Sequence, residues 1–476
     1  MTSSNDAPPS LYAQQEPIFP RRVYGFFRNL KWALMVFTLG VYYLTPWIRW
    51  DRGPNLPDQA VLVDLAHRRF FMFWIEIWPH EFYFVAGLLI MAGLGLFLFT
   101  SALGRVWCGY ACPQTVWTDL FILVERWIEG DRNARLRLHK ARWSFSKARL
   151  RLTKWFTWLL IAISTGGAWV FYFADAPTLL HDFVTGQAAF VAYGSVAFLT
   201  GTTFLFGGFA REQICIYACP WPRIQAAMMD EDTITIGYRD WRGEPRGKHR
   251  KSDEADQLGD CIDCMACVNV CPMGIDIRNG QQLECITCAL CIDACDDIMT
   301  KIGKPRGLID YMALTDEANE RAGKPKKPVW KHIIRVRTLV YTGLWSLVGV
   351  LLVVALFTRS EIDLNVSPIR NPVFVTMSDG SIRNTYDLRI RNKQGEAHPF
   401  AVSVTGDKDL SVSLQGVETT TIDVPADETG SHKVYLTATK GSAAATGTLV
   451  EIRIWVEDTV TGDRAFSDTV FHGAGK

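Results

Sequence analysis

The sequence predicts a multi-domain integral membrane protein, with an α-helical membrane domain, a cysteine-rich insert and an all-β domain at the C-terminal end. Three observations support this prediction. Apolar residues come in blocks near membrane-spanning length, and the 476 residues include 17 Trp and 27 Phe, many of them near the block ends. All 12 cysteines lie between Cys108 and Cys295. After Phe357 the composition changes to short runs of alternating apolar and polar residues rich in Thr, Val and Ser.

Length, charge and the N-terminal sequence limit the number of domains, the kinds of partner and the nature of the N-terminal tail. A chain of this length has room for two or three domains. The net charge of +1 argues against a nucleic-acid partner. Residues 1–30 are expected to form a cytoplasmic tail, and residues 1–20, which are polar and contain several prolines, to be disordered. They lack the basic-then-apolar plan of a signal peptide, so we expect no cleavage.

Five apolar stretches are expected to cross the membrane. They are residues 32–47, 82–99, 155–173, 190–209 and 339–357. A buried core helix is the alternative for each stretch, but none of the five contains Lys, Arg, Asp or Glu. The sequence therefore predicts a four-helix membrane region at residues 31–209 and a fifth transmembrane helix at residues 337–358.

The charges of the loops predict the orientation in a bacterial inner membrane. Residues 125–154 carry ten Lys or Arg against three acids, whereas residues 174–187 carry no Lys or Arg. Basic residues also precede the first and last stretches. Because cytoplasmic loops are enriched in Lys and Arg, we expect the N-terminus and residues 210–336 in the cytoplasm and residues 360–476 in the periplasm. The exception is the first outer loop, with Arg52, Arg68 and Arg69, which the larger inner clusters outweigh.

The cysteine-rich insert contains the spacing C-x2-C-x2-C-x3-C twice, which is typical of bacterial two-cluster ferredoxins. In that arrangement the fourth Cys of each run ligates the cluster of the other run. We therefore predict a ferredoxin-like domain at about residues 255–305 with two [4Fe–4S] clusters. The predicted ligands are Cys261, Cys264, Cys267 and Cys295 for one cluster, and Cys285, Cys288, Cys291 and Cys271 for the other. Zinc rarely needs this doubled pattern, and disulfides are not expected in a reducing cytosol.

A second cysteine motif, C-x-Y-A-C-P, follows the second and fourth apolar stretches at residues 108–113 and 215–220, an offset of 107. Cysteines four apart lie on one side of a helix turn. If the two helical hairpins pack as a pseudo-symmetric pair, four thiols meet at the cytoplasmic membrane face: Cys108, Cys112, Cys215 and Cys219. Inert buried cysteines are the alternative, but two copies in register favour a shared metal or redox role. Copper, another metal and quinol all stay open as ligands there.

Residues 360–476 are predicted to form an immunoglobulin-like sandwich. About seven short runs alternate apolar and polar residues, as in residues 450–456, and turn signals such as residues 378–380 separate them. This domain shows no catalytic constellation. On the outer side, haem or copper ligation by His67, His80 and His181 is conceivable, but solvated or hydrogen-bonded histidine is the default. In the sandwich, Met377, His398 and His432 could be weak copper ligands, but scattered surface residues are the default.

These motifs together resemble one known family over nearly the whole chain. The matching stretches are residues 46–54, 104–117, 129–132 and 304–309, together with the doubled cysteine runs. The chain is similar to the accessory proteins of cbb3-type cytochrome c oxidase, called CcoG, FixG or RdxA, which are related to membrane ferredoxins of the NapH and NosR type. The resemblance implies that the protein reduces Cu(II) to Cu(I) for maturation of that oxidase. It also implies copper as substrate, and oxidase subunits or copper chaperones or transporters as partners.

The predicted route of electrons follows from these sites. Iron–sulfur clusters move one electron at a time, and soft thiolates favour Cu(I) over Cu(II). We expect electrons to pass from a cytosolic reductant or membrane quinol to the clusters, then to the four membrane-edge thiols and copper. Two alternatives remain: a quinol dehydrogenase serving a periplasmic partner, although the sequence has no CxxCH haem motif, and a non-catalytic assembly scaffold. Membrane lipid surrounds the spans, and the sequence leaves a homodimer open.

Overall fold

The computed structural model describes residues 17–53, 56–248, 258–359, 362–393, 396–406, 409–417, 419–426 and 428–475. Most of the N-terminal tail expected to be disordered therefore lies outside the described residues. The chain divides into two compact units. The first comprises Met1–Ile48 and Gln59–Leu351, and the second comprises Arg49–Asp58 and Leu352–Lys476.

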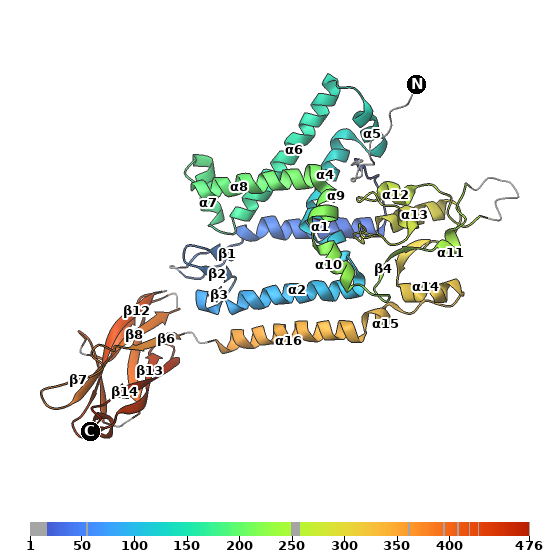
Figure 1. Cartoon of the computed structure of the whole chain (residues 1–476). Helices are drawn as coiled ribbons and strands as arrows, with labels where there is room; N and C mark the ends of the chain where they lie inside the picture. The colour runs from blue at the N-terminus through green and yellow to red at the C-terminus, as the bar shows by residue number, and fades with distance from the viewer. Residues whose placement is uncertain are drawn as a thin grey trace, which may run out of the picture. The chain divides into compact units, whose positions relative to one another are not determined.

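Helices form at all five apolar stretches (Figure 1). Each helix except the fourth is continuous, and the fourth consists of α8 followed by the π-helix η3. Their bounds are α1 (Phe26–Leu44), α2 (Tyr83–Leu103), α6 (Phe145–Val170), α8 (Phe190–Thr203), η3 (Phe204–Ala210) and α16 (Val336–Thr358).

Within the described part of the chain, three helical segments are long and apolar enough to cross a membrane by length and composition: Tyr83–Leu103, Phe190–Ala218 and Val336–Thr358. Helices α1 and α6 do not meet this criterion, so it supports three of the five predicted spans. The reason is charge within the helices, because α1 begins with Arg28 and Lys31 and α6 carries Lys147 and Lys154 in its first half. The uncharged runs that remain are shorter than the roughly 20 apolar residues that a span needs.

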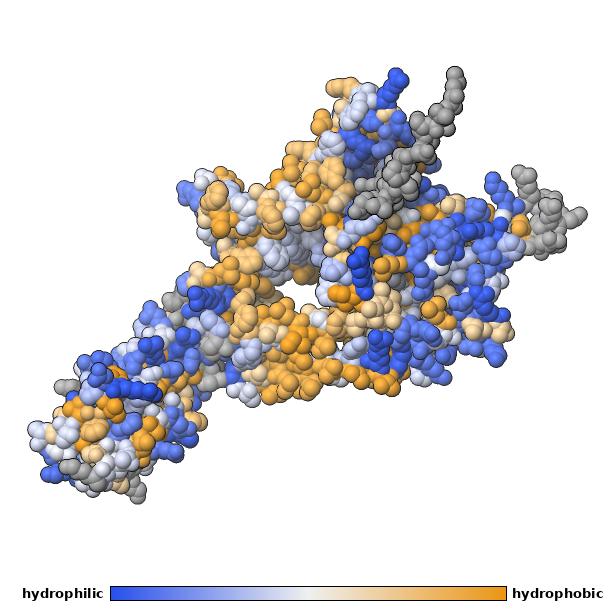
Figure 2. Space-filling model, in the orientation of Figure 1, coloured by the Kyte–Doolittle hydropathy of each residue, from blue (hydrophilic) through white to orange (hydrophobic). Residues whose placement is uncertain are grey.

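The apolar side chains of α2 and α16 cover much of the surface of these helices, shown in orange in Figure 2. The two helices lie side by side, with the rings of Phe97 and Tyr341 6.4 Å apart. The most apolar part of α16 is 0% buried. A soluble protein seldom exposes so long an apolar surface, whereas a helix in contact with lipid does.

Helices α4 (Pro113–Glu129), α6 and α8 pack closely around an aromatic centre. Phe121 stacks on the fully buried Trp158 with ring centroids 5.2 Å apart. Glycines permit the approach of the helices: a Cβ on Gly166 would lie 2.9 Å from the carbonyl oxygen of Val196. This packing holds the basic segment around α4 against the ends of the membrane helices.

A buried ionic cluster joins α4 to α5 (Arg132–Lys140) and α6. Glu125 pairs with Arg135, with Arg211 at 2.5 Å and with Lys154 at 3.3 Å. Glu129 pairs with Arg151 and with Lys154, at 3.1 and 2.9 Å. The cations hold the pKa of Glu125 below its usual value although burial raises it. Breaking one buried pair leaves the other charge uncompensated, so this cluster fixes how α4, α5 and α6 pack.

The cysteine-rich insert is a small α/β unit. Strands β4 (Thr235–Tyr238) and β5 (Ile309–Met312) pair antiparallel beside α12 (Ala266–Val270) and α13 (Leu290–Lys301). Short elements complete this first unit: η1 (Thr45–Trp47), β1 (Val61–Asp64), β2 (Arg69–Met72), β3 (Ile75–Ile77), η2 (Pro79–Glu81), α3 (Val106–Tyr110), α7 (Ala176–Thr185), α9 (Arg211–Gln213), η4 (Ile214–Ala218), α10 (Trp221–Met228), α11 (Asp240–Gly243), η6 (Ile277–Asn279), α14 (Leu314–Arg321) and α15 (Val329–Ile333).

The C-terminal part of the chain forms the predicted two-sheet sandwich. One sheet has the order β10-β12-β8-β6, with β7 paired to β8, and the other has the order β11-β9-β13-β14. Tyr386 is almost fully buried and its hydroxyl donates to the carbonyl of Val470 at 2.8 Å, which ties the two sheets together. The elements are β6 (Ile362–Pro368), β7 (Val375–Thr376), β8 (Ile382–Asn392), β9 (His398–Thr405), β10 (Leu410–Leu414), β11 (Thr421–Val424), β12 (Thr429–Ala438), α17 (Ala443–Thr446), β13 (Leu449–Asp458) and β14 (Arg464–His472).

Candidate iron–sulfur and thiol sites

The structure brings Cys295 to the first cysteine run. Cys261, Cys264, Cys267 and Cys295 line one cavity, which Tyr238 and Arg278 also border. Cys261 and Cys264 come from the loop that leads into α12, Cys267 comes from α12 itself, and Cys295 comes from α13. Apolar side chains form the rest of the wall, among them Ile298, Met299 and Leu308.

The structure likewise brings Cys271 to the second run. In addition to the effect of burial, the Cys271 thiol lies close enough to Cys285 and Cys288 for their negative charges to raise its pKa. The pKa of Cys291 is raised in the same way by all three. Cys291 is also close to Cys267 of the first set, so the two sets are neighbours. This is the crossed arrangement that the spacing predicts, whereas the identity of the ligands remains a prediction.

The backbone around both sets repeats an uncommon conformation. Asp263 and Met265 have φ angles of 52° and 57°, and the equivalent Thr287 and Ala289 have 55° and 60°. Residues with a side chain seldom adopt this left-handed region unless their surroundings impose it. Left-handed residues next to right-handed ones bend a loop around a centre and turn its amides toward an anion. Four thiols, an apolar wall and such a loop fit a [4Fe–4S] cube in each set.

Burial raises the pKa of several of these thiols. It raises the pKa of Cys267 to about 11 and that of Cys271 and of Cys295 to about 12. A buried thiol without a positive partner therefore stays protonated at neutral pH. Bound iron supplies the positive charge that makes a buried thiolate stable, so cluster assembly should release protons.

The structure also brings the four membrane-edge cysteines together. Cys108 lies within electrostatic range of Cys112 and Cys219, and Cys215 within range of the other three. The local geometry differs from the expected single helix turn. Helix α3 ends at Tyr110, so Cys112 caps the start of α4, and Cys215 lies in the π-helix η4, which Cys219 follows. Inserted π turns are frequent at functional sites.

The Cys108 thiol has a defined partner. Its S–H donates to the side-chain oxygen of Gln225 at 3.1 Å, and the Gln225 amide donates to the hydroxyl of Thr100 at 3.2 Å. Gln225 is buried within α10, the helix that follows the second motif. Burial raises the pKa of the Cys108 thiol, and the nearby Arg105 partly offsets that rise. No pattern in the sequence points to Gln225, because glutamine in a short helix is ordinarily a surface residue.

The described residues form no complete site for a single metal ion. Across the described residues, no three His, Cys, Asp or Glu side chains converge tightly enough to hold one metal ion. Cluster ligands attach to separate corners of a cube, so this spacing is compatible with the two ferredoxin sets.

Three of the histidines considered as ligands lie beside a carboxylate in the structure. The His67 ring lies 2.7 Å from Asp64, and the His398 ring lies 2.7 Å from the buried Asp458. His181 is exposed beside Asp182. His432 belongs to β12 and Met377 to the turn after β7, while the side chain of His80 lies outside the description.

The first thiol motif lies directly against the second cluster loop. The Tyr110 hydroxyl donates to the carbonyl of Cys288 at 3.1 Å, and Arg105 donates to the carbonyl of Leu283. A Cβ on Gly109 would lie 2.6 Å from the carbonyl oxygen of Ile286, so only glycine permits this approach. The second motif has Ile216 at the equivalent position. The glycine in the first copy and the isoleucine in the second could therefore have indicated, from sequence alone, a close contact made only by the first motif.

Comparison with known proteins settles the family. A model described as a 4Fe–4S dicluster domain matches residues 210–314, and one described as a 4Fe–4S binding domain matches residues 84–131. The model for the IG-like fold at the C-terminal of FixG matches residues 352–474. The chain is 69% identical to protein RdxB of Cereibacter sphaeroides over 476 residues, with all of both chains covered. The chain belongs to the FixG/RdxA family. The resemblance noted from the motifs is thereby confirmed.

Two further members of the FixG/RdxA family align over most of their length. Protein RdxA of Cereibacter sphaeroides is 62% identical, covering 98% of this chain and 99% of its own. The nitrogen fixation protein FixG of Rhizobium meliloti is 52% identical, covering 91% of this chain and 88% of its own. The 4Fe–4S binding match includes Cys108 and Cys112, whereas the dicluster match includes Cys215, Cys219 and both ferredoxin-type runs. The chain is therefore an iron–sulfur protein of a redox type.

Proposed function

We propose that this member of the FixG/RdxA family transfers electrons to copper, reducing Cu(II) to Cu(I) for assembly of a cbb3-type oxidase. The observation that carries the proposal is the direct contact between the Cys108–Cys112 motif and the loop of Cys288. Cys108 and Cys215 both pack on the core that contains Cys288 and Ile286. The second cysteine set and the membrane-edge thiols therefore share one packed core, which favours electron transfer between them.

The protein's own residues have defined parts in this reaction. When bound, the two clusters supply one-electron transfer, which matches the single electron that turns Cu(II) into Cu(I). The four membrane-edge thiols provide soft ligands that stabilise Cu(I). Gln225 orients the Cys108 thiol through its side-chain oxygen. Because burial raises the pKa of Cys108, copper binding at that sulfur should release a proton.

The test is copper reduction by the purified protein. Anaerobic protein reduced in advance should oxidise its clusters as Cu(II) is added, with one Cu(I) formed per electron lost and captured by a Cu(I)-specific chelator. A parallel sample reduced only by a quinol identifies the donor. Clusters that stay reduced in the presence of Cu(II) would contradict the proposal, and re-oxidation of those clusters by quinone alone would favour a quinol dehydrogenase.

We further propose five membrane crossings, in which α1 and α6 accompany the three apolar spans. Contacts at the two ends of each helix pair support this. The amide of Arg28 donates to Asp293 at 2.8 Å, and Arg105 contacts the same insert, so the start of α1 and the end of α2 lie on one side. A chain that leaves and returns to one side crosses an even number of times. If α2 crosses, α1 crosses with it.

The same reasoning applies to α6 and α8. Cys108 precedes this pair and Cys215 follows it, and both pack on the insert. At the opposite ends, the amide of Val63 donates to the carbonyl of Tyr172 at 2.8 Å, so the loop before α2 meets the end of α6. The charged residues that keep α1 and α6 from meeting the apolar criterion lie in the N-terminal half of each helix.

The orientation can be tested with topology reporters. A reporter fused after Lys476 should be active only in the periplasm, and one inserted at Arg250 only in the cytoplasm, because the basic segments flank the insert. A reporter placed after Gly186 should be periplasmic if α6 crosses, since α7 follows it directly. A cytoplasmic signal at Gly186 would reduce the crossings to three and contradict the pairing of α6 with α8.

A further inference from the structure

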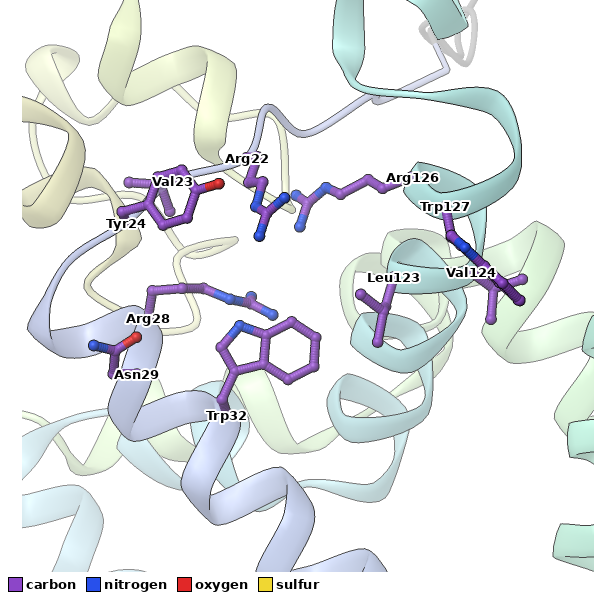
Figure 3. A pocket seen from close by; sticks show the side chains of 10 residues that line it. All are labelled: Arg22, Val23, Tyr24, Arg28, Asn29, Trp32, Leu123, Val124, Arg126 and Trp127. Atoms are coloured by element: carbon purple, nitrogen blue, oxygen red, sulfur yellow. The ribbon is translucent and has the colours of Figure 1, made fainter.

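A cavity of about 620 Å³ lies between the start of α1 and the C-terminal half of α4 (Figure 3). Three guanidinium groups line it, from Arg22, Arg28 and Arg126, and no acidic residue does. In Figure 3 the side chains of Arg22 and Arg126 point toward one another across the opening. Such a concentration of positive charge in a hollow is costly unless an anion compensates it.

Two of these cations have buried donors without an acceptor. The Arg28 side chain is only 5% exposed, and its Nη1 donates to Asp119 at 3.0 Å while its Nη2 has no hydrogen-bond partner. The Nη2 of Arg126 donates to the carbonyl of Pro20 at 3.2 Å, and its buried Nε also lacks a partner. Buried donors are nearly always satisfied in folded proteins, so unpaired guanidinium donors beside a cavity indicate a ligand that accepts hydrogen bonds.

The charge of the cavity persists at neutral pH. Burial and the neighbouring Arg28 lower the pKa of Arg126 to about 10, which leaves it protonated. Asp119 does not neutralise the group by itself, because it also faces Lys31 at 3.9 Å. A planar guanidinium fork matches the oxygens of a phosphate group better than it matches a neutral ligand.

The rim of the cavity is apolar and aromatic. Trp32 stacks with Arg28 at 4.2 Å, and Leu123 and Trp127 are 38% and 81% exposed. Tryptophan beside basic residues at a helix end is typical of the membrane interface. A quinol would need a carboxylate or imidazole to accept its protons, and neither lines the cavity.

From these observations we propose that the cavity binds a phosphate group, carried by an anionic phospholipid whose acyl chains lie along Leu123 and Trp127. The site goes beyond copper reduction and does not depend on it. A lipid bound here would bridge α1 and α4 at the point where the amide of Arg28 also holds Asp293 of α13. It would therefore stabilise the attachment of the cysteine-rich insert to the membrane helices.

The experiment is lipid binding by the full chain in a neutral detergent, followed by native mass spectrometry. Phosphatidylglycerol should be retained in preference to phosphatidylcholine, and R22Q and R126Q should each weaken its binding by about tenfold. R22Q removes an exposed side chain, so it tests the site without the risk of misfolding, and R142Q removes a matched exposed arginine elsewhere on the basic segment. Cluster absorbance should be unchanged in all three variants.

Each alternative has its own outcome. Equal retention of phosphatidylcholine, or retention of phosphatidylglycerol by R22Q and R126Q at the level of R142Q, would overturn the proposal. Inorganic phosphate should not displace the lipid at millimolar concentration, and displacement would show that a free anion is the ligand. Loss of quinone binding in R126Q, with lipid binding intact, would assign the cavity to quinol instead.

Discussion

Replacing Cys295 with serine should remove the [4Fe–4S] cluster of the first cysteine run, and replacing Cys271 should remove that of the second. The physical reason is the crossed arrangement: Cys295 shares a cavity with Cys261, Cys264 and Cys267, whereas Cys271 lies with the second run. A hydroxyl is too weak an acid to replace a thiolate in a buried site. The loss should be large, because a cube with one ligand missing is open to solvent.

The measurement is iron content with spectroscopy of the two clusters. Anaerobically purified wild-type protein should hold about eight iron atoms, four per cube, and each variant about half of that. Double variants show which cluster is lost: adding Cys264→Ser to Cys295→Ser should remove no further iron, whereas adding Cys288→Ser should remove the remainder. Loss of the cluster of the variant's own run would contradict the crossed assignment.

The predicted grouping of the eight ferredoxin-type cysteines came from their spacing in the sequence. The runs around Cys264 and Cys288 are short loops, and a ligand pattern within a loop hardly depends on the rest of the fold. The left-handed residues such as Met265 and Ala289 could not be foreseen, because no glycine marks them. Gln225 contacts the thiol motif only through tertiary packing, so the pattern of the motif alone does not reveal it.

Strand prediction succeeded where one face of the strand is buried. The alternation in β8 and β13 follows the burial of every second residue, and both runs lie within observed strands. β14 gives no such signal, since most of its residues are only partly buried and its sequence lacks a clean apolar alternation. Residues 129–132 are polar, yet Glu129 is buried and paired with Lys154. A charged residue in the sequence does not by itself show whether it forms a buried ion pair with a distant residue.

The membrane helices show the limit of an apolar-window criterion. α1 and α6 begin with buried cations, which the ionic partners Asp119, Glu125 and Glu129 compensate. The partners come from α4, distant in sequence from α1. If α1 and α6 cross as proposed, a count of uncharged residues underestimates the length of a membrane helix whose cations are paired.

Replacing any one of Cys108, Cys112, Cys215 or Cys219 with serine should nearly abolish Cu(II) reduction. Serine offers a hard, weakly acidic oxygen where Cu(I) prefers sulfur. Both clusters should remain, because their eight predicted ligands are untouched. Initial rates of Cu(I) formation, with iron content measured on the same samples, provide the test. Tyr217→Phe is the matched control, since Tyr217 lies between two of the cysteines and is largely exposed.

The pattern among combined variants separates the mechanisms. If the four thiols act as one site, the double variant of Cys108 and Cys112 should be little worse than either single variant, because members of a unit are not additive. A non-catalytic scaffold predicts normal oxidase assembly in all four single variants. A quinol dehydrogenase predicts lost quinol oxidation with copper chemistry unaffected. Full copper reduction in the serine variants, with both clusters intact, would move the copper site away from the membrane-edge thiols and leave the Gly109 contact with the second cluster loop without a redox role.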